Sequence, residues 1–565
     1  MKPVDEQAAA RLAAELEIPP PIARILVNRK MADAESARKF LHGSIDDLHD
    51  PFLLSGMEKA VERILQAVGR GEKILIFGDY DVDGVLSVVM LIDVLKWIGA
   101  HADYFIPERL KDGYGIKDDH VRIAEERDAK LVVSVDCGIK SNGFVKAARE
   151  RGIDVIVTDH HLPGDELPPA LAVLDPVLES AGYPDRSLAG VGVAYKLLQA
   201  LLERAKLSPE QIASKQARLL SYMKLVSIGT VSDVAKLKGE NRIFVKQGLK
   251  GLENITNEGL KSLINVAGLS GKKITEGDIG FRIGPRINAA GRMKNADIAV
   301  KLFFSGSDEA ALHAALLDQL NAERQASEER IYKQAYERIA KGALVDRHKI
   351  LILGCPTWHR GIIGIVASKL KDAFGRPVIL FSFADGTAYG SGRSISEFSL
   401  INCLHECGSL FLTYGGHELA AGCTLRLDDL PAFKQAANAV AEARITDEHL
   451  RRKIEIDAKL DFAEIDASFR KSLGLLAPFG VGNPRPVFVS EDVEVVGAPR
   501  LLKNGRHVKF VLGQSGRTLE AIGWDRGSWA DGVRRGDRVS VAYGLQYSTY
   551  LGLDQWTLNL AGMRK

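Results

Sequence analysis

Residues 74–84 read ILIFGDYDVDG, an apolar run typical of a buried strand that leads directly into three aspartates. Two later stretches repeat this pattern, LVVSVD at 131–136 and VIVTDHH at 155–161. Continuous apolar runs of this length are typical of parallel strands that are covered on both faces. In an open α/β sheet, ligands bind beyond the carboxyl ends of such strands. We therefore expect the acids and histidines of these stretches to converge at one edge of one parallel sheet.

Acids gathered in this way predict a metal centre. Carboxylates that lie close together repel one another unless cations lie between them. Oxygen ligands with one or two imidazoles suit Mn²⁺ or Mg²⁺, and a site this acidic has room for two ions. Asp79, Asp81 and Asp83 alternate, which predicts that they share one side of an extended segment. The alternatives are a polar turn or a calcium loop, but an EF-hand would need a glutamate at its twelfth position, which is absent.

Length and composition are those of an ordinary globular protein. The chain has 565 residues, of which 46% are hydrophobic and 26% charged, enough for about three or four domains. No apolar run approaches the roughly 20 residues of a membrane span, and the first residues lack the pattern of a signal peptide. Five scattered cysteines favour a reducing compartment, so we expect a cytoplasmic protein. The net charge of +2 means that nucleic-acid binding would need local basic patches.

The pattern of predicted elements changes along the chain and divides it. The uninterrupted helical stretch before Gly342 would be roughly 50 Å long and suits a connector between two domains. Short alternating strands near the end are typical of an OB-like barrel, and residues 171–176 predict a further strand of the first sheet. The predicted divisions are a helical segment at 1–50, an α/β domain at 51–305, the long helix at 306–343, a second α/β domain with two glycine-rich turns at 344–448, and the barrel at 449–565.

Several motifs resemble known families. Asp159-His160-His161, with the upstream Asp-x-Asp-x-Asp-Gly, resembles the DHH phosphoesterase superfamily. The motifs that follow resemble the bacterial RecJ exonuclease family: GTVSDV at 229–234, IGPRINAAGR at 283–292, GSGRS at 390–394, GGH at 415–417, AAG at 420–422 and PFGVGNP at 478–484. This resemblance implies a parallel-sheet DHH domain, a DHHA1-type second domain and an OB-fold nucleic-acid-binding domain. It also implies hydrolysis of single-stranded DNA from the 5′ end, with Mn²⁺ or Mg²⁺, to 5′-mononucleotides in DNA recombination and repair.

The resemblance assigns roles to single residues. The implied metal ligands are Asp81, Asp83, Asp136, His160 and Asp233, with Asp79 either a ligand or a neighbour of one. Asp136 is expected to bridge the ions, and Asp233 rests on the resemblance alone, because such an aspartate is usually a turn or cap residue. Related pyrophosphatases carry a histidine where this chain has Phe77. Asp159 is expected to orient a histidine, and His161 to face the substrate as a phosphate donor or proton source, unless it makes only a structural hydrogen bond.

A basic segment at 282–294 contains no acid. We expect Arg286, Asn288 and Arg292 to hold the DNA backbone, with Arg286 stabilising charge on the reacting phosphate, because guanidinium binds phosphate bidentately. The alternative is a solvated basic loop. Arg109 and Tyr114 match a family stretch near the DNA entrance, where Tyr114 either stacks on a base or packs.

The polarity of hydrolysis requires a site for the 5′ end. We expect the glycine-rich turns to form an anion nest for the terminal phosphate, with Arg109 closing the pocket. The alternative is that the glycines make tight turns and that the arginine makes a surface ion pair. The residues concerned are Ser391, Arg393, Gly415, Gly416 and His417.

The barrel carries basic residues beside aromatic ones. Lys503, Arg506 and Lys509 predict contact with single-stranded DNA, since OB folds combine a cationic track with stacking. Trp524 and Trp556 are expected in the barrel core.

Two other functions fit parts of the pattern. A DHH phosphodiesterase acting on dinucleotides usually ends after the second domain, and a metal-free scaffold would have lost the acids that this chain retains. The expected partners are single-stranded DNA, a helicase and a single-strand-binding protein, with no membrane.

Overall fold

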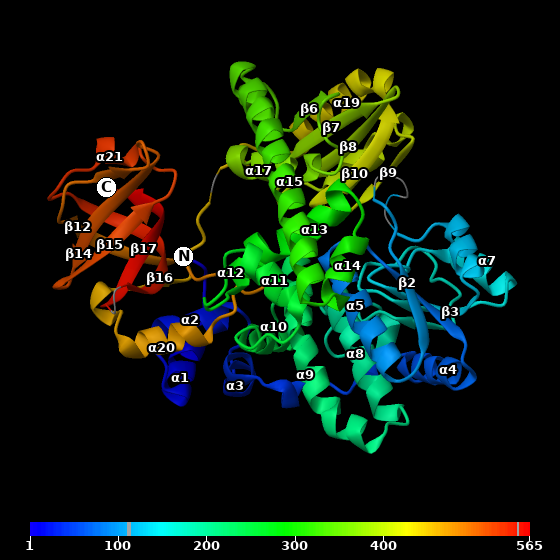
Figure 1. Cartoon of the computed structure of the whole chain (residues 1–565). Coiled ribbons are helices and arrows are strands. Elements are labelled where there is room, and N and C mark those ends of the chain that lie inside the picture. The colour runs from blue at the N-terminus through cyan, green and yellow to red at the C-terminus, as the bar shows by residue number, and fades with distance from the viewer. Residues whose placement is uncertain (110–112, 114, 452, 551–552) are drawn as a thin grey trace.

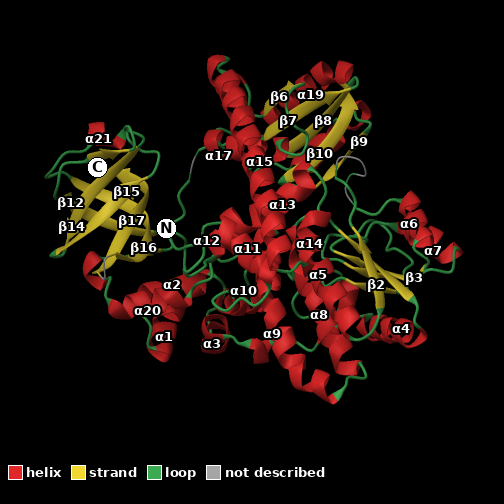
Figure 2. Cartoon of the chain, viewed as in Figure 1, coloured by secondary structure: helices red, strands yellow, loops and turns green. Residues whose placement is uncertain are grey.

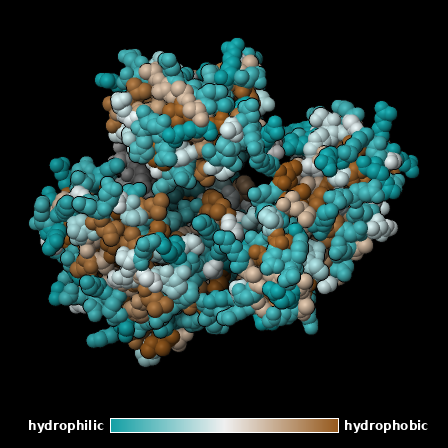
Figure 3. All heavy atoms as spheres, turned by 180° about the vertical axis from the view of Figure 1, so that it is seen from behind, coloured by the Kyte–Doolittle hydropathy of each residue, from teal (hydrophilic) through white to brown (hydrophobic). Residues whose placement is uncertain are grey.

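The structure is a computed structural model that describes residues 1–109, 113, 115–451, 453–550 and 553–565. Its three sheets lie in separate lobes, with helix α15 (Ser307–Lys341) running between the first two and the C-terminal barrel standing apart (Figure 1). From behind, the surface is largely hydrophilic and is hollowed where the lobes meet (Figure 3). Among the described residues, no helix combines the length and the apolar character needed to cross a membrane.

The first sheet is entirely parallel, as expected from its apolar strands, with the order β2-β1-β3-β4-β5. The predicted strand at 171–176 is confirmed as its edge strand β5, whereas β2 was not predicted because its residues are only partly buried. The bounds are β1 Lys73–Gly78, β2 His101–Phe105, β3 Ala129–Val135, β4 Asp154–Thr158 and β5 Ala172–Leu174.

Helices cover both faces of this sheet, which explains the continuous apolar runs. Ile74 and Ile76 point into a core shared with α4, α5 and α8, while Leu75 and Phe77 point into a second core with α6 and α7. The alternation of β1 therefore places every second residue in each core. The bounds are α4 Met57–Arg70, α5 Val82–Trp97, α6 Val121–Glu126, α7 Asn142–Glu150 and α8 Gly190–Arg204.

A helical layer completes the first domain and leads into α15. The predicted long helix is confirmed, and its two halves belong to different cores: Ala310 and Leu317 pack in the first domain, and Ile331 and Ile339 in the second. The helix thus connects two domains while contributing to the packing of each. The layer consists of α9 Pro209–Ser232, α10 Gly239–Gly251, α11 Glu258–Val266, α12 Glu276–Asp278, the π-helix η5 Ile279–Ile283, α13 Gly284–Met293 and α14 Asp297–Phe304.

The second sheet has the order β6-β7-β8-β10-β9, with only β6 and β7 parallel. The prediction of two glycine-rich turns is wrong, because Gly390–Arg393 lies within strand β8, and Gly415 and Gly416 lie within β9. Their small side chains suit close packing across the sheet, and their backbone groups enter its ladder. The bounds are α16 Leu344–Arg347, β6 Leu351–Cys355, α17 Ile363–Phe374, β7 Val378–Ala384, β8 Thr387–Arg393, α18 Leu400–Glu406, β9 Thr413–Gly416, β10 Ala420–Arg426 and α19 Leu430–Arg444.

The C-terminal sheet closes on itself as the predicted OB-like barrel (Figure 2), because β12 pairs with both β16 and β14. The N-terminal helices share a core with it: Ile22 and Leu26 cluster with Phe469 and Phe488. The segment at 1–50 is therefore helical as expected and packs against the far end of the chain. The bounds are α1 Glu6–Leu16, α2 Pro20–Asn28, α3 Ala34–His42, β11 Ala458–Lys459, α20 Ala467–Leu475, β12 Phe488–Val495, β13 Arg500–Leu502, β14 His507–Gln514, β15 Arg517–Gly523, α21 Trp529–Gly532, β16 Arg538–Tyr550 and β17 Leu553–Arg564.

Candidate active site

The carboxyl edge of the first sheet brings the predicted acids and histidines together. Asp79 follows β1, Asp136 follows β3 and His160 follows β4, while Asp233 caps the C-terminus of α9. Ligating atoms of three overlapping groups lie within 4.8 Å of one another: Asp79, Asp81 and Asp136; Asp83, His160 and Asp233; and Asp136, His160 and His161. Convergence at one sheet edge is thus the arrangement that the sequence predicted.

Asp81 and Asp83 are held by helix termini. The Asp81 side chain caps α5 and accepts hydrogen bonds from the Asp83 and Gly84 amides. Asp83 lies in the first turn of α5, so the prediction that all three alternating acids share an extended segment is wrong. The two carboxylate oxygens of Asp83 accept hydrogen bonds from the amides of Gly190 and Val191, at 2.8 and 2.9 Å, at the start of α8. These amides are a contribution that sequence reasoning missed; the only signal was the small-residue run at 190–192.

The strongest sign of a cation site is a pair of buried atoms without hydrogen bonds. Asp136 Oδ1 and His160 Nε2 lie 3.0 Å apart, and neither they nor Asp79 Oδ1 makes a hydrogen bond to any residue that the structure describes. His160 Nε2 also lies 3.8 Å from Asp83 and 3.9 Å from Asp233. Buried polar atoms are almost always partnered, so these atoms fit the coordination of a hard divalent cation by oxygen and imidazole.

The electrostatics of this group also favour a cation. Burial, with the charge of neighbouring carboxylates, raises the pKa of Asp83 to about 7 and that of Asp233 to about 9. The same causes hold the pKa of Asp79 and Asp136 well above the ordinary range. Burial, with the charge of His161, lowers the pKa of His160 to about 4, which keeps its imidazole neutral and able to bind metal. Without positive charge between them, the carboxylates resist ionisation together.

Asp159 holds His161 in a fixed orientation. One Asp159 oxygen accepts from the amides of His160 and His161 and lies 2.7 Å from His161 Nδ1, while the other accepts from the Ile139 amide. Burial lowers the pKa of His161, but its hydrogen bond to Asp159 and the charge of that carboxylate outweigh the effect and raise it to about 9. The His161 side chain is 34% exposed, so a protonated imidazole faces the opening of the site.

Helix α13 carries all three residues that were predicted to hold the DNA backbone, and two of them, Asn288 and Arg292, contact elements next to the site. The side-chain amide oxygen of Asn288 accepts from the Val82 amide at the start of α5, and Arg292 donates to the Gly361 carbonyl in the second domain. Burial lowers the pKa of Arg292 to about 10, and Asp81 is among the charges that act on it. The basic segment is therefore helical, and the alternative of a solvated loop is wrong.

The prediction that Arg286 lies beside the reacting phosphate disagrees with the contacts that Arg286 makes. Its guanidinium lies 2.8 Å from the Asp318 carboxylate on α15 and donates to the Arg282 carbonyl at 2.6 Å. On a helix, residue 286 faces away from 288 and 292, which lie about 200° and 240° around the axis from it. Arg286 therefore fastens α13 to the long helix.

A pocket of about 520 Å³ lies between the first two domains beside this group. Tyr80, Arg109 and Lys117 line it from the first domain, and Ser391 and Gly415 from the second. Arg360 and Tyr389 line it too, with the guanidinium 4.0 Å from the ring centroid. Sequence reasoning missed this pair, whose only signal is an arginine beside the glycine at 361.

Arg393 and His417 also lie toward the cleft between these domains. Burial, with the nearby charge of Arg109, lowers the pKa of Arg393, and a side chain on Gly364 would come within 3.4 Å of its guanidinium. Burial, with the charges of Lys140 and His161, lowers the pKa of His417. Gly416 has a positive φ of 141° at the end of β9. Tyr114 lies outside the described residues.

Two of the three predicted basic residues of the barrel have acidic partners. Arg506 pairs with Asp525, and Lys509 lies 2.5 Å from Glu520. Lys503 is exposed in the turn between β13 and β14. Trp556 is buried as expected, but the prediction for Trp524 is wrong: it is 49% exposed and donates to Asn559 on the outer face of the barrel.

Comparison with known proteins agrees with this arrangement. The DHH family, N-terminal domain, matches residues 73–230, the DHHA1 domain matches 347–443 and the RecJ OB domain matches 456–562. The single-stranded-DNA-specific exonuclease RecJ of Bacillus subtilis is 38% identical over 95% of this chain and 67% of its own length. That of Escherichia coli is 35% identical over 95% of this chain and 94% of its own.

Solved structures give the same result. The crystal structure of RecJ in complex with Mn²⁺ from Thermus thermophilus matches with a TM-score of 0.83 and 31% identity, covering 100% of this chain and 79% of that one. The corresponding Mg²⁺ complex matches with a TM-score of 0.77 and 29% identity, covering 100% of this chain and 78% of that one. With its three matched domains and its relatives along almost the whole sequence, the chain belongs to the RecJ family of single-stranded-DNA-specific exonucleases.

Proposed function

We propose that this chain hydrolyses single-stranded DNA from the 5′ end, releasing 5′-mononucleotides with the help of two divalent metal ions. The observation that carries the proposal is the buried contact between Asp136 and His160, whose facing atoms lie 3.0 Å apart without a hydrogen bond. Mn²⁺ and Mg²⁺ are named in the related structures and suit a donor set of carboxylates and imidazole.

The donor set divides into two groups of ligands. Asp79, Asp81 and Asp136 would hold one ion, and Asp83, His160 and Asp233 the other. Asp136 stands within reach of His160 as well, which supports a bridging role. Bound divalent cations would supply Lewis-acid activation of the attacking water and of the phosphoryl oxygens.

The chain's own side chains supply orientation and protons. The amides of Gly190 and Val191 fix both oxygens of Asp83, so this carboxylate keeps its direction without a cation. Asp159 keeps His161 protonated and aimed at the opening, where it would donate to a phosphoryl oxygen as negative charge develops there. The leaving 3′ oxygen takes its proton from the opening of the site, which is where His161 is exposed.

The pocket between the domains would bind the terminal phosphate. Arg109 and Ser391 line it from opposite domains, and Arg393 stands near both. A hydroxyl and two guanidinium groups suit a phosphate better than the anion nest that the sequence suggested, because the glycines there belong to strands. A phosphate held one nucleotide beyond the metal ligands would set the 5′ to 3′ polarity.

The test uses single strands labelled at either end, incubated with Mn²⁺, Mg²⁺ or chelator. We expect a 3′-labelled strand to shorten gradually and a 5′-labelled strand to release labelled mononucleotide at once, in either metal and not in chelator. Immediate release of labelled mononucleotide from the 3′ end would overturn the proposed polarity, and undiminished hydrolysis in chelator would overturn the metal centre.

The remaining expectations are proposals of the same kind. The divisions at residues 50 and 448 are supported by the limits of the buried clusters among the described residues, and those at 305 and 343 by the bounds of α15, whose two halves pack into the cores on either side. A role in DNA recombination and repair, together with a helicase and a single-strand-binding protein, would follow from the need for a supply of single strands.

A further inference from the structure

Two exposed apolar residues lie near the end of α9, where the proposed ligand Asp233 caps the helix. Phe281 is 83% exposed, although an aromatic ring of this size is normally buried. It lies in the π-helix η5, and π-bulges occur frequently at functional sites. Its neighbour Gly280 faces Val231 in the last turn of α9, with a separation of 3.8 Å from the position of a side-chain carbon. Phe281 is therefore presented to solvent next to the end of α9.

Val234 is the second of these residues. It follows Asp233, is 63% exposed and has a φ of 63°. Glycine is the usual residue in this conformation at a helix C-terminus, and a β-branched residue is a genuine outlier there. Val234 thus keeps an apolar side chain in solvent at a position where glycine would suit the backbone better, which indicates that the side chain itself has a use.

The segments that carry these residues lead toward the barrel. The Leu237 amide donates to the Val481 carbonyl at 2.7 Å, and Val481 is itself 44% exposed. Arg485 pairs with Glu276 on α12, immediately before η5, at 3.1 Å. The segments that carry Val234 and Phe281 are therefore both joined to the loop that precedes the barrel.

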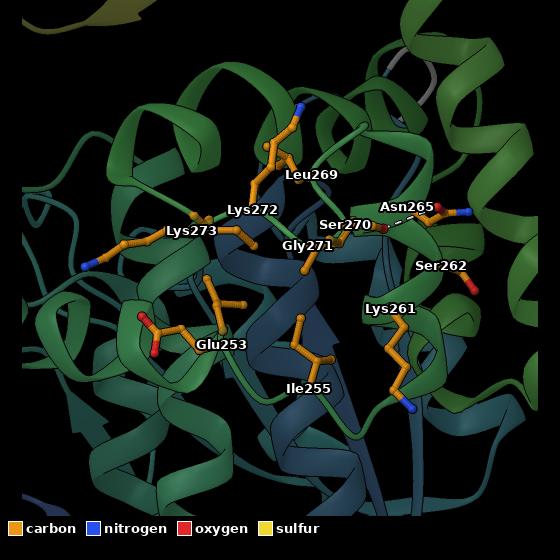
Figure 4. A pocket seen from close by; sticks show the side chains of 13 residues that line it. Glu253, Ile255, Lys261, Ser262, Asn265, Leu269, Ser270, Gly271, Lys272 and Lys273 are labelled. Atoms are coloured by element: carbon orange, nitrogen blue, oxygen red, sulfur yellow. Dashed lines mark hydrogen bonds between the residues drawn. The ribbon is translucent and has the colours of Figure 1, made fainter. Parts of the chain in front are cut away.

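The surroundings of this surface are basic. Lys236 and Lys238 pack against the loop at 482, and the acids Asp278 and Glu276 are paired with Arg282 and Arg485. Lys272 and Lys273 extend the positive charge before α12. They diverge on the rim of a hollow of about 750 Å³ (Figure 4). Lysines around exposed apolar side chains complement a strand whose phosphates are anionic and whose bases have apolar faces.

We propose that Phe281 and Val234 form an apolar step that positions the nucleotides on the 3′ side of the scissile phosphate, with Phe281 stacking on a base. The inference rests on the proposed function, because it takes Asp233 as a ligand and the pocket between the domains as the place of the 5′ end. The segments that carry the step contact the loop before the barrel, so a strand that continues from the metal ligands toward the barrel would pass it. Stacking accepts every base and would hold the strand without reading its sequence.

The test compares Phe281→Ala and Val234→Gly with the matched control Ile212→Ala, a comparably exposed apolar residue at the far end of α9. Single strands carry 2-aminopurine at successive positions from the 5′ end, and its fluorescence is measured with chelator present. Hydrolysis is then measured with metal, on a trinucleotide and on a long strand with a trap for free enzyme.

With wild-type protein and Ile212→Ala, we expect 2-aminopurine to be quenched at one or two positions just beyond the scissile phosphate. Phe281→Ala should abolish this quenching and weaken binding of the long strand by about tenfold, with more frequent release into the trap. Val234→Gly should weaken binding by about threefold while its melting temperature is unchanged or raised, because glycine adopts the backbone conformation freely. Hydrolysis of the trinucleotide should also require a higher substrate concentration in Phe281→Ala, because its nucleotides beyond the scissile phosphate reach the step.

Quenching, affinity and processivity equal to those of Ile212→Ala in both variants would overturn the apolar step. If instead the wild-type protein and Ile212→Ala also fail to hydrolyse either substrate, the proposed function fails, and the two failures are thereby distinguished.

Discussion

The carboxyl edge of the first sheet and the outer face of the barrel both carry charged residues, but they differ in how those charges are partnered. At the sheet edge, Asp136 Oδ1 and His160 Nε2 are buried without a hydrogen bond to the described part of the chain. On the barrel, Arg506 is paired with Asp525 and Lys509 with Glu520, and these side chains are at least 30% exposed. Charge alone therefore does not distinguish the two regions. They differ in whether their polar atoms have partners among the described residues.

This difference predicts which residues serve catalysis and which serve DNA binding. A buried, unpartnered carboxylate costs free energy in the metal-free protein, so it is retained where a cation or substrate offsets that cost. An exposed ion pair contributes about 0–1 kcal/mol and can exchange its partner for a phosphate with little penalty. Substitutions at the sheet edge should therefore affect turnover strongly, and those on the barrel should affect binding weakly.

The largest effect is expected from Asp136→Asn. Turnover of single strands should fall by about a thousandfold or more, since the cations' contribution to the transition state is removed. In chelator, the melting temperature of the variant should equal or exceed that of the wild type, because one of several repelling buried acids is removed. Steady-state hydrolysis measures the loss of turnover, and calorimetry in chelator and with Mn²⁺, together with metal analysis, measures the change in stability.

The stabilisation by Mn²⁺ is the informative control in this experiment. It should be large for the wild type and much reduced for Asp136→Asn. Wild-type turnover with full metal content would contradict the metal centre, and a lower melting temperature in chelator would show that Asp136 stabilises the fold.

Arg393→Ala should act on one kind of substrate. We expect hydrolysis of 5′-phosphorylated strands to slow by about ten- to a hundredfold, and that of 5′-hydroxyl strands much less, because the variant cannot make a charge-assisted hydrogen bond to the terminal phosphate. Arg426→Ala is the matched control, an exposed arginine on the same sheet that is paired with Asp429. Equal slowing of both substrates by Arg393→Ala would move the end-recognition site elsewhere.

Arg286→Ala tests a basic residue that was expected at the active site but is paired with Asp318 on α15. Because Arg286 fastens α13 to α15 through Asp318, the free energy of unfolding should fall by about 1–2 kcal/mol with turnover nearly unchanged. Thermal denaturation and steady-state hydrolysis measure the two effects. A large loss of turnover at an unchanged melting temperature would return Arg286 to the reacting phosphate.

Much of the fold was predictable because its signals are local. The strands that end at Asp79, Asp136 and Asp159 are continuous apolar runs, and α15 is an uninterrupted helical pattern. Their convergence follows from the geometry of parallel sheets. The strand β2 was missed because its residues are half-exposed, and the glycines of β8 and β9 suggested turns because glycine is rare inside strands.

The residue types of the site were predictable, but the orientations of its side chains were less so. Asp233 carries no local signal of metal binding and came from the family motif alone. The orientation of Arg286 depends on Asp318, which lies on another helix, and the exposure of Trp524 depends on the turn that follows β15 and on its contact with Asn559. The hydrogen bonds from the α8 amides to Asp83 join residues more than a hundred positions apart, so the sequence near either residue does not predict them.

The smallest effect is expected from the barrel and tests whether its pairs exchange partners with DNA. In the double variant with Lys503→Ala and Arg506→Ala, turnover of a trinucleotide should be unchanged and binding of a long strand only a fewfold weaker. The slope of log affinity against log salt should become shallower by about 0.7 for each phosphate that is no longer neutralised. Asp525→Asn should have the reverse effect on affinity, because it releases Arg506 from its ion pair. An unchanged slope in the first variant and unchanged affinity in the second would mean that these charges only maintain the surface. In that case, binding of DNA by the barrel would fall to the exposed ring of Trp524 and the groups around it.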